Sequence, residues 1–497
     1  MILLVLLPGF FWIQSVKRIE QPAKMGLAVI FQLARETPQK PHLWGAALVG
    51  LLLAAMIIWL MHKAAKTEFG GAPFRRFFRG TKIVSQAKLA RMTKQRGVDQ
   101  IRLAGVPIPP KLEPLHNLIV GSTGAGKTVT FKEVTYWALK RGDRALIVDP
   151  NAELYSIFGR PGDTLLNPFD SRSPGWQYFN EIRTDYDHER YAMSVVGSGN
   201  SREQEEWYAY GRLLVAETGR KLQLLGRPSI RDLHRMTTLV PPEELHKFLQ
   251  GTAAESLFTG ADRALASARF LLSTKLAPHL KTPVGDFSIR RWLEEEKEGN
   301  LFITWREDQH VALRPLISAW TDIFATSVLS LPPSQDRRLW MMLDELASHD
   351  KLPSLEAAVT KGRKHGLRVV AGLQTVAQAE EIYGVKQAQT LLATFRNVLV
   401  LGGTRVDEQT NKVLSGALGA HEVERERYGM NSAPGAQSVS SSLDGPREEK
   451  LVMPSQVGGM AELEGYLALA QHWPVAKVKL KPVDYKVVNQ PFVSVEI

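Results

Sequence analysis

The sequence predicts an α/β protein built on a doubly wound, mostly parallel sheet, with an inserted all-α domain and an apolar helical hairpin at the amino terminus. Three observations lead to this prediction. Short apolar strands alternate with helical stretches over residues 112–174 and 286–497. Residues 175–285 have helical periodicity almost throughout. Residues 1–62 hold two apolar runs.

The amino-terminal apolar runs predict a transmembrane hairpin. Residues 43–61, LWGAALVGLLLAAMIIWLM, are uncharged and have Trp near both ends, as spanning helices do. The first run, about residues 2–16, is shorter and contains Pro8. We prefer a span to a signal peptide there, because the run lacks a basic start and a small-residue cleavage site. Two spans would leave both chain ends on one side of a membrane.

Basic charge is concentrated beside the second span. The chain of 497 residues has a formal net charge of +11, and residues 63–111 contain twelve Lys or Arg against two acids. We interpret this stretch as a basic juxtamembrane segment that contacts lipid headgroups. The chain has no cysteine, which excludes disulfides and thiolate metal sites.

A phosphate-binding motif stands at residues 117–130, NLIVGSTGAGKTVT. It matches G-x-x-x-x-G-K-T between an apolar strand and a helix, the context in which such a loop surrounds phosphates with backbone N–H groups. Lys127 would reach the β- and γ-phosphates, and Thr128 would ligate Mg²⁺. The sequence therefore predicts a site for ATP and Mg²⁺, which places the long carboxy-terminal part in the cytoplasm. The predicted binding residues are Gly121, Ser122, Thr123, Gly124, Ala125, Gly126, Lys127 and Thr128.

Acidic and amide side chains follow three other strands. RRLWMMLDELASH ends a strand at Asp344 and Glu345, and we assign Asp344 to the metal and Glu345 to the general base that activates water. LRVVAGLQT ends at Gln374, which would sense the γ-phosphate or position water, or else is a polar residue at a strand end. Asp149, in RALIVDPNAE, is either functional or the cap of a turn with Pro150.

Two further features allow more than one interpretation. The segment TKGRKHG holds Lys361, Arg363, Lys364 and His365, which fit a solvated helix end or an arginine finger for a neighbouring active site. In the helical region, Trp207 could stack on bases, although aromatic residues at helical spacing usually belong to the core. Residues 430–446, MNSAPGAQSVSSSLDGP, have the polar, low-complexity composition of a loop.

The sequence resembles type IV coupling proteins of the TrwB/TraD kind. The segments that carry this resemblance are, in order along the chain, RGTKIVSQAKLA, GSTGAGKT, LIVDPNAELY, LNPFD, LDELASHDKLPSLEAAVTKGRKHGL and GLQT. That resemblance implies a RecA-like domain plus an all-α domain, assembled as a homo-hexameric ring at the bacterial inner membrane. It implies a DNA-dependent ATPase that couples relaxase-processed DNA and relaxosome proteins to a type IV secretion channel and pumps single-stranded DNA. It also gives the family's active-site roles to Lys127, Thr128, Asp344, Glu345 and Gln374, and the arginine-finger role to Arg363.

Two alternatives remain open. A double-stranded DNA translocase of the FtsK/HerA type shares the motor, but the chain lacks the long linker and separate winged-helix end typical of FtsK. A membrane-anchored scaffold with a silent nucleotide site is the other alternative, and the intact Lys, Thr, Asp, Glu and Gln argue against it.

Overall fold

The computed structural model of this chain has two compact units. They are Met1–Phe78 with Val423–Arg447, and Arg79–Glu422 with Glu448–Ile497. The structure describes residues 3–20, 27–65, 76–199, 201–259, 262–295, 299–424, 426–433, 436–443 and 445–495.

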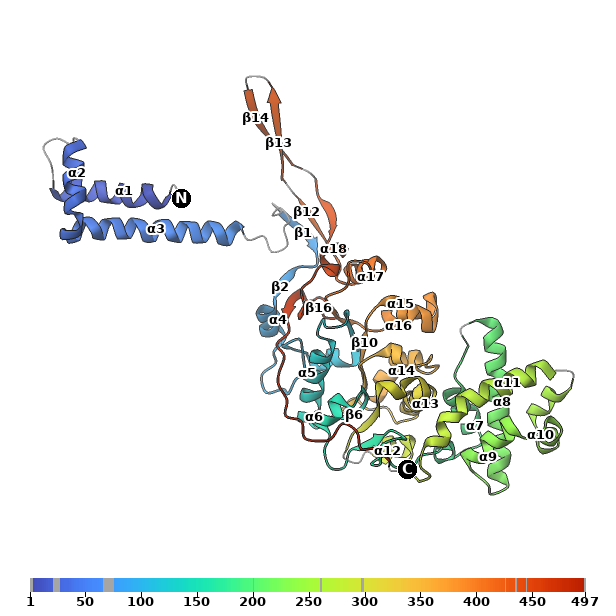
Figure 1. The fold of residues 1–497 in the computed structure, drawn as a ribbon. Helices are drawn as coiled ribbons and strands as arrows, with labels where there is room; N and C mark the ends of the chain where they lie inside the picture. Colours follow the sequence, from blue (N-terminus) through green and yellow to red (C-terminus); the bar gives the residue numbers. More distant parts are fainter. Residues whose placement is uncertain are drawn as a thin grey trace. The chain divides into compact units, whose positions relative to one another are not determined.

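Figure 1 shows the helices and strands of the chain. The α-helices are α1 Leu3–Ser15, α2 Leu27–Glu36, α3 Pro41–Ala65, α4 Gln86–Thr93, α5 Lys127–Lys140, α6 Glu153–Phe158, α7 Asp187–Val196, α8 Arg202–Leu224, α9 Ile230–His234, α10 Pro242–Leu249, α11 Asp262–Leu276, α12 Ile289–Glu295, α13 His310–Val328, α14 Leu355–Lys361, α15 Val376–Tyr383, α16 Val385–Ala393, α17 Glu408–Ala417 and α18 Pro454–Gly458. The strands are β1 Arg76–Gly80, β2 Ile83–Ser85, β3 Arg102–Leu103, β4 Val106–Pro107, β5 Asn117–Val120, β6 Arg144–Pro150, β7 Thr164–Leu166, β8 Leu301–Trp305, β9 Leu339–Leu343, β10 Leu367–Leu373, β11 Asn397–Leu401, β12 Ala420–Glu424, β13 Glu426–Ala433, β14 Ala436–Leu443, β15 Arg447–Lys450, β16 Glu464–Ala468 and β17 Val475–Lys479.

The second unit is organised around a ten-stranded sheet in the order β2-β17-β16-β11-β5-β10-β9-β6-β8-β7. The seven strands from β11 to β7 run parallel to one another. β16 is antiparallel to both of its neighbours, β11 and β17. The strand that precedes the phosphate-binding motif, β5, lies near the middle, and the non-consecutive order requires crossover connections. The predicted doubly wound, mostly parallel sheet is therefore confirmed.

Both faces of this sheet are apolar and covered by helices. Along β9, Met341 and Leu343 belong to one buried core, whereas Trp340 and Met342 belong to the other. Side chains alternate between the two faces of a strand, so a strand buried on both faces reads as a continuous apolar run. Helix α13 packs in the first core, and α5 contributes Phe131 to the second.

Between β7 and β8 the described residues form helices and no named strand. Helices α7 to α11 gather beside the sheet (Figure 1), and α7 and α11 contact α13. The predicted change from strands to helices is thus present.

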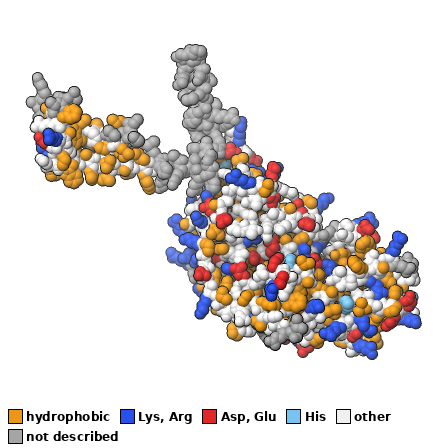
Figure 2. Space-filling view, in the orientation of Figure 1, with side chains coloured by type: hydrophobic (Ala, Val, Ile, Leu, Met, Phe, Trp, Pro, Cys, Tyr) orange, Lys and Arg blue, Asp and Glu red, His pale blue; other side chains and the backbone are white. Residues whose placement is uncertain are grey.

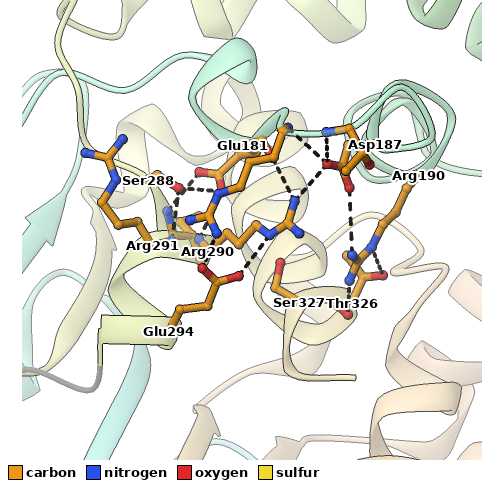
Figure 3. Close-up of polar contacts among 12 residues, drawn as sticks. Glu181, Asp187, Arg190, Ser288, Arg290, Arg291, Glu294, Thr326 and Ser327 are labelled. Carbon is orange, nitrogen blue, oxygen red and sulfur yellow. Dashed lines mark hydrogen bonds and ion pairs between the residues drawn. The ribbon is translucent and has the colours of Figure 1, made fainter. Parts of the chain in front are cut away.

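A buried carboxylate joins the segments that enter and leave this helical region (Figure 3). Glu181 is fully buried and precedes α7. Groups at the start of α12 donate hydrogen bonds to its carboxylate oxygens. It accepts hydrogen bonds from Ser288 Oγ (2.9 Å) and from the backbone N–H groups of Ile289 (2.8 Å) and Arg290 (2.9 Å). The Arg290 guanidinium also donates to Asp187 at 2.8 Å. The helical region is therefore held at its base by satisfied polar contacts.

In the first unit, α1 packs along α3 (Figure 1). A Cβ on Gly50 of α3 would lie 2.7 Å from the Leu7 carbonyl oxygen, so the two backbones touch. Hydrophobic side chains cover this hairpin, and charged groups gather at one end (Figure 2). There the Glu20 carboxylate accepts from Lys40 Nζ at 3.0 Å and contacts His42 Nε2 at 3.0 Å.

The prediction of two membrane spans is supported for one of them. Among the described residues, one helix is long and apolar enough to cross a membrane, over Pro41–Leu60. The helix over the predicted first span, α1, has 13 residues. That length is short of the roughly 20 residues that cross a hydrocarbon core.

The loop interpretation of residues 430–446 is wrong for most of that segment. Residues Glu426–Ala433 and Ala436–Leu443 pair as an antiparallel hairpin, in which Met430 lies opposite Val439 and Ala433 opposite Ala436. A polar composition does not prevent this pairing, because backbone groups supply the ladder hydrogen bonds.

Candidate nucleotide site

The phosphate-binding motif forms a loop between β5 and α5. Gly124 (φ 79°) and Gly126 (φ 110°) have left-handed backbones, which glycine adopts without steric cost. A Cβ on Gly126 would also lie 2.5 Å from Leu480 Cδ1. Ser122 donates from its hydroxyl to the Gly402 carbonyl at 2.8 Å, which ties the loop to the end of β11. The loop therefore leads directly into the amino terminus of α5, where an anion is favoured.

Lys127 is the first residue of α5, and its side chain folds back over the loop. Its Nζ donates to the Gly121 carbonyl oxygen at 2.8 Å. Burial lowers the pKa of Lys127, and the charges of Glu345 and Asp344 oppose that shift. Thr128 follows in the same turn and is half-buried. The lysine and threonine of the motif therefore lie at the mouth of the loop.

The acidic pair directly follows β9, two strands from β5 in the sheet. Within the described part of the chain, Asp344 Oδ1 and Glu345 Oε1 are buried and have no hydrogen-bond partner. Burial and the neighbouring Glu345 raise the pKa of Asp344 to about 7, against the attraction of Lys127. Burial also raises the pKa of Glu345. Unpartnered buried acceptors are costly to keep, so these oxygens are arranged for a cationic or hydrogen-donating ligand.

Gln374 follows β10, which lies between β5 and β9. Its Nε2 donates to Glu345 Oε2 at 2.9 Å, and its Oε1 accepts from Thr123 Oγ1 at 3.4 Å. The amide therefore connects the phosphate-binding loop to the acidic pair. Of the predicted site residues, the structure brings together Lys127, Thr128, Asp344, Glu345 and Gln374. They lie where the parallel strands have their carboxyl ends, which we call the carboxyl edge of the sheet; the amino edge is the opposite side, where these strands begin.

Asp149 has a structural role in this edge. Its Oδ1 accepts from the Leu154 N–H at 3.0 Å and its Oδ2 from the Tyr155 N–H at 2.7 Å. Both N–H groups belong to the first turn of α6, whose donors lack partners within the helix. Burial raises the pKa of Asp149 to about 7. The capping interpretation is therefore favoured over the catalytic one.

Arg363 lies away from these residues. It belongs to the short 3₁₀ helix Gly362–His365 that precedes β10, whereas Gln374 follows β10. The seven residues of that strand alone span about 23 Å. Arg363 lines an open groove of about 850 Å³ together with Lys111, Arg338, Lys361, Lys364 and Arg368. The sequence did not show this separation, and Arg363 cannot serve the nucleotide site of its own chain.

A buried charge network on the amino edge of the sheet was missed from the sequence. Glu113 accepts from Arg141 Nη1 at 2.7 Å and from Arg368 Nε at 3.0 Å. Asp143 accepts from the Arg141 guanidinium and from Trp340 Nε1 at 2.8 Å. The available signal was Arg368 inside the apolar run LRVVAGL, because a charge in a buried strand requires a partner.

The side chains of this site fit a Mg²⁺ ion that is bound together with a nucleotide, and they do not fit a metal ion held by protein ligands alone. Among the described residues there is no group of three or more His, Cys, Asp or Glu that could hold an ion alone. Mg²⁺ is usually held by one or two carboxylates together with substrate phosphates and water. The orphaned Asp344 oxygen, beside a glycine loop shaped for phosphates, supplies that kind of partial site.

The family model for the type IV secretion-system coupling protein DNA-binding domain matches residues 100–481. The chain belongs to this family. It is 27% identical over 463 residues to coupling protein TraD of Escherichia coli (strain K12), and the match covers 88% of this chain. It spans 64% of the length of TraD.

Two solved structures share this fold. The bacterial conjugative coupling protein TrwBΔN70, in an unbound form, is 53% identical with a TM-score of 0.82, and the match covers 86% of this chain and 99% of TrwBΔN70. Plasmid coupling protein TrwB in complex with ADP and Mg²⁺ is 52% identical with a TM-score of 0.80, covering 86% and 100% respectively. The predicted family and fold class, including the RecA-like nucleotide-binding domain, are confirmed.

Proposed function

We propose that this protein is a hexameric, DNA-dependent ATPase of the bacterial inner membrane. It couples DNA processed by a relaxase to a type IV secretion channel and pumps single-stranded DNA during conjugation. The observation that supports this best is the pair of buried, unpartnered oxygens of Asp344 and Glu345 beside Lys127 and the glycine loop. TrwB, which is 52% identical, binds ADP and Mg²⁺ in its solved complex.

Each residue at the carboxyl edge has a separate proposed role. The loop N–H groups and Lys127 bind the phosphates, and Lys127 exchanges the Gly121 carbonyl for a phosphate oxygen. Thr128 and Asp344 hold Mg²⁺, which supplies charge stabilisation at the transferring phosphoryl group. Glu345, oriented by the Gln374 amide, accepts the proton of the attacking water.

Arg363 is proposed to act on a neighbouring subunit. It lies at the opposite edge of the sheet from its own Lys127, in a groove lined by five further cations. Packing this groove against a neighbour's carboxyl edge would bring Arg363 to that neighbour's γ-phosphate. A closed ring of identical contacts would complete the site of every subunit in this way, as the proposed hexamer requires.

The proposed domain organisation follows the sequence. A membrane hairpin (1–62) has two arms. The first arm is α1 with its continuation Val16–Glu20, so that it runs from Leu3 to Glu20, and the second arm is α3. A basic juxtamembrane segment (63–111) follows, but its part from Arg79 belongs to the second compact unit and supplies β2, an edge strand of the central sheet. The RecA-like domain (112–174 and 286–497) holds the all-α domain (175–285). We place the bulk of the chain in the cytoplasm, where ATP, relaxosome proteins and DNA are accessible, and the hairpin beside the inner-membrane components of the channel.

One experiment separates this function from its alternatives. Hydrolysis of ATP by the full-length protein in detergent is measured alone, with single-stranded DNA and with duplex DNA of equal nucleotide concentration. We expect single strands to stimulate turnover more than duplex does. Preferential stimulation by duplex supports a translocase of the FtsK/HerA type instead. Absence of hydrolysis in all three conditions supports a scaffold with a silent site.

A further inference from the structure

A polar cleft of about 410 Å³ lies between the helical region and the loops of the carboxyl edge. Its walls come from the start of α8, from α11 and α13, from the loop after Glu345, and from α15. The charged side chains that line it are the cations Lys275, Arg314 and Lys351 and the acids Asp350 and Glu381. The cleft therefore has an excess of positive charge, and nothing in the nucleotide site accounts for it.

Asp350 is shared between two of these cations. Its Oδ2 accepts from Lys275 Nζ at 2.5 Å, and its Oδ1 lies 3.2 Å from Arg314 Nε. Lys275 belongs to α11 of the helical region and Asp350 to the loop that follows β9, so this contact connects the helical region to that loop. Asp350 is therefore the carboxylate that Lys275 and Arg314 share, and Glu381 is the other acid that lines the cleft.

The same cleft adjoins the loops after β9 and β10, which carry the acidic pair and Gln374. Asp350 follows Glu345 by five residues, with a short 3₁₀ helix (Leu346–Ser348) between them. Gln378, which also lines the cleft, follows Gln374 by four residues and caps α15 through a hydrogen bond from the Thr375 N–H. A ligand in the cleft would therefore act directly on the loops that position the proposed base and the proposed sensor.

We propose that this cleft binds the phosphate backbone of single-stranded DNA, and that a phosphate replaces Asp350 as the counter-ion of Lys275 and Arg314. The exchange substitutes one anion for another, and Arg314 can form a bidentate contact with phosphate. Such contacts position a strand without reading its sequence, as a pump requires. The proposal rests on the proposed function, and it places DNA sensing in the loop that begins at Glu345.

Binding of a fluorescein-labelled 30-nucleotide oligothymidylate to the full-length protein in detergent provides the first test. Lys275→Gln should raise the Kd about fivefold and reduce the slope of log Kd against log salt by about 0.7, the value for one phosphate contact to a single strand. Asp350→Asn should lower the Kd about threefold, because it removes the competing anion. The matched controls are Lys412→Gln and Glu408→Gln, which remove the members of an exposed ion pair on α17 and should leave the Kd unchanged.

Two further measurements test which ligand the cleft binds and how its binding affects ATP hydrolysis. Inorganic phosphate at the same phosphate concentration should not displace the oligonucleotide, whereas unlabelled oligothymidylate should. Asp350→Asn should also raise DNA-free hydrolysis of ATP about threefold, towards the DNA-stimulated rate. Nucleotide affinity, which is expected to stay at the wild-type value, reports that the variants are folded.

The proposal is overturned if Lys275→Gln binds the oligonucleotide with the wild-type Kd and salt slope, or if Asp350→Asn weakens binding. Displacement by inorganic phosphate at equal concentration would also contradict it, because the site would then be an anion site without preference for a strand. In each of these outcomes wild-type stimulation by DNA can persist, so the proposed function survives. A wild-type protein that neither binds the oligonucleotide nor responds to it contradicts both.

Discussion

The two edges of the central sheet bury charge in opposite ways. At the amino edge, Glu113, Asp143, Arg141 and Arg368 are nearly inaccessible, and each is paired with an opposite charge. At the carboxyl edge, Asp344 and Glu345 each retain a buried oxygen without a partner within the described residues. Lys127 is directed at a backbone carbonyl.

The difference separates charges that hold the fold from charges reserved for a ligand. A paired buried network tolerates burial because each charge is compensated, and it is costly to break. An uncompensated carboxylate shifts its pKa upward, as Asp344 does, to about 7. We infer that the carboxyl edge lowers stability in the free protein and recovers it when nucleotide and metal bind.

The largest expected effect is on turnover. Lys127→Ala should reduce ATP hydrolysis at least about 10²–10³-fold, because the developing charge on the γ-phosphate loses its counter-charge. The matched control is Lys132→Ala, which removes a lysine of α5 that pairs with Glu153, and it should stay within about twofold of wild type. Steady-state hydrolysis at saturating ATP measures both. Comparable losses in the two variants would show that the carboxyl edge is not the reacting site.

The next prediction contrasts the stability of the two edges. Glu113→Gln should lower the free energy of unfolding by about 3–5 kcal/mol, because it leaves Arg141 and Arg368 without full compensation. Asp344→Asn should leave the stability of the nucleotide-free protein unchanged or raise it, because it removes an uncompensated charge. Denaturant unfolding of both variants without nucleotide measures this difference. A larger loss in Asp344→Asn than in Glu113→Gln would reverse the assignment of the two edges.

A smaller, pH-dependent effect is expected at the amino edge. Burial, opposed by its contact with the Val359 carbonyl, lowers the pKa of His116 to about 4, and the charges of Arg363 and Arg368 contribute to the lowering. The unfolded chain therefore binds a proton below pH 6.5 that the folded chain does not bind. Stability should fall as the pH drops from 6.5 towards 4, by about 2 kcal/mol at pH 5 for this group.

His116→Gln is the variant that isolates this effect. The unfolding free energy of the variant should change less between pH 7.5 and pH 5 than that of the wild type, by about the same 2 kcal/mol. Other buried histidines, such as His349, contribute equally to both proteins and cancel in the comparison. An identical pH dependence in the variant and the wild type would show that His116 titrates normally in the folded chain.

The sequence predicted the carboxyl edge well, because its residues follow strands directly. The motif Gly121–Thr128 and the pair Asp344–Glu345 are each contiguous, and parallel strands bring their carboxyl ends together. The amino-edge network could not be predicted, because Glu113 and Arg368 are 255 residues apart and only the packing of the 3₁₀ helix Pro110–Leu115 against β10 brings them together. The hairpin of β13 and β14 was missed because its sequence is polar and lacks the apolar alternation from which strands are predicted.

We propose that Arg363 connects the amino edge of one subunit to the carboxyl edge of the next, and mixed rings test that connection most directly. Lys127→Ala and Arg363→Ala chains should each be inactive alone, the second because an arginine finger contributes about 10³-fold or more to turnover. A mixture contains interfaces that pair an intact Lys127 with an intact Arg363 from a neighbour, so ATP hydrolysis should partly recover. Cross-linking confirms that the two chains assemble together. Co-assembly without any recovery of hydrolysis would contradict the account in which the amino edge of one subunit completes the carboxyl edge of the next.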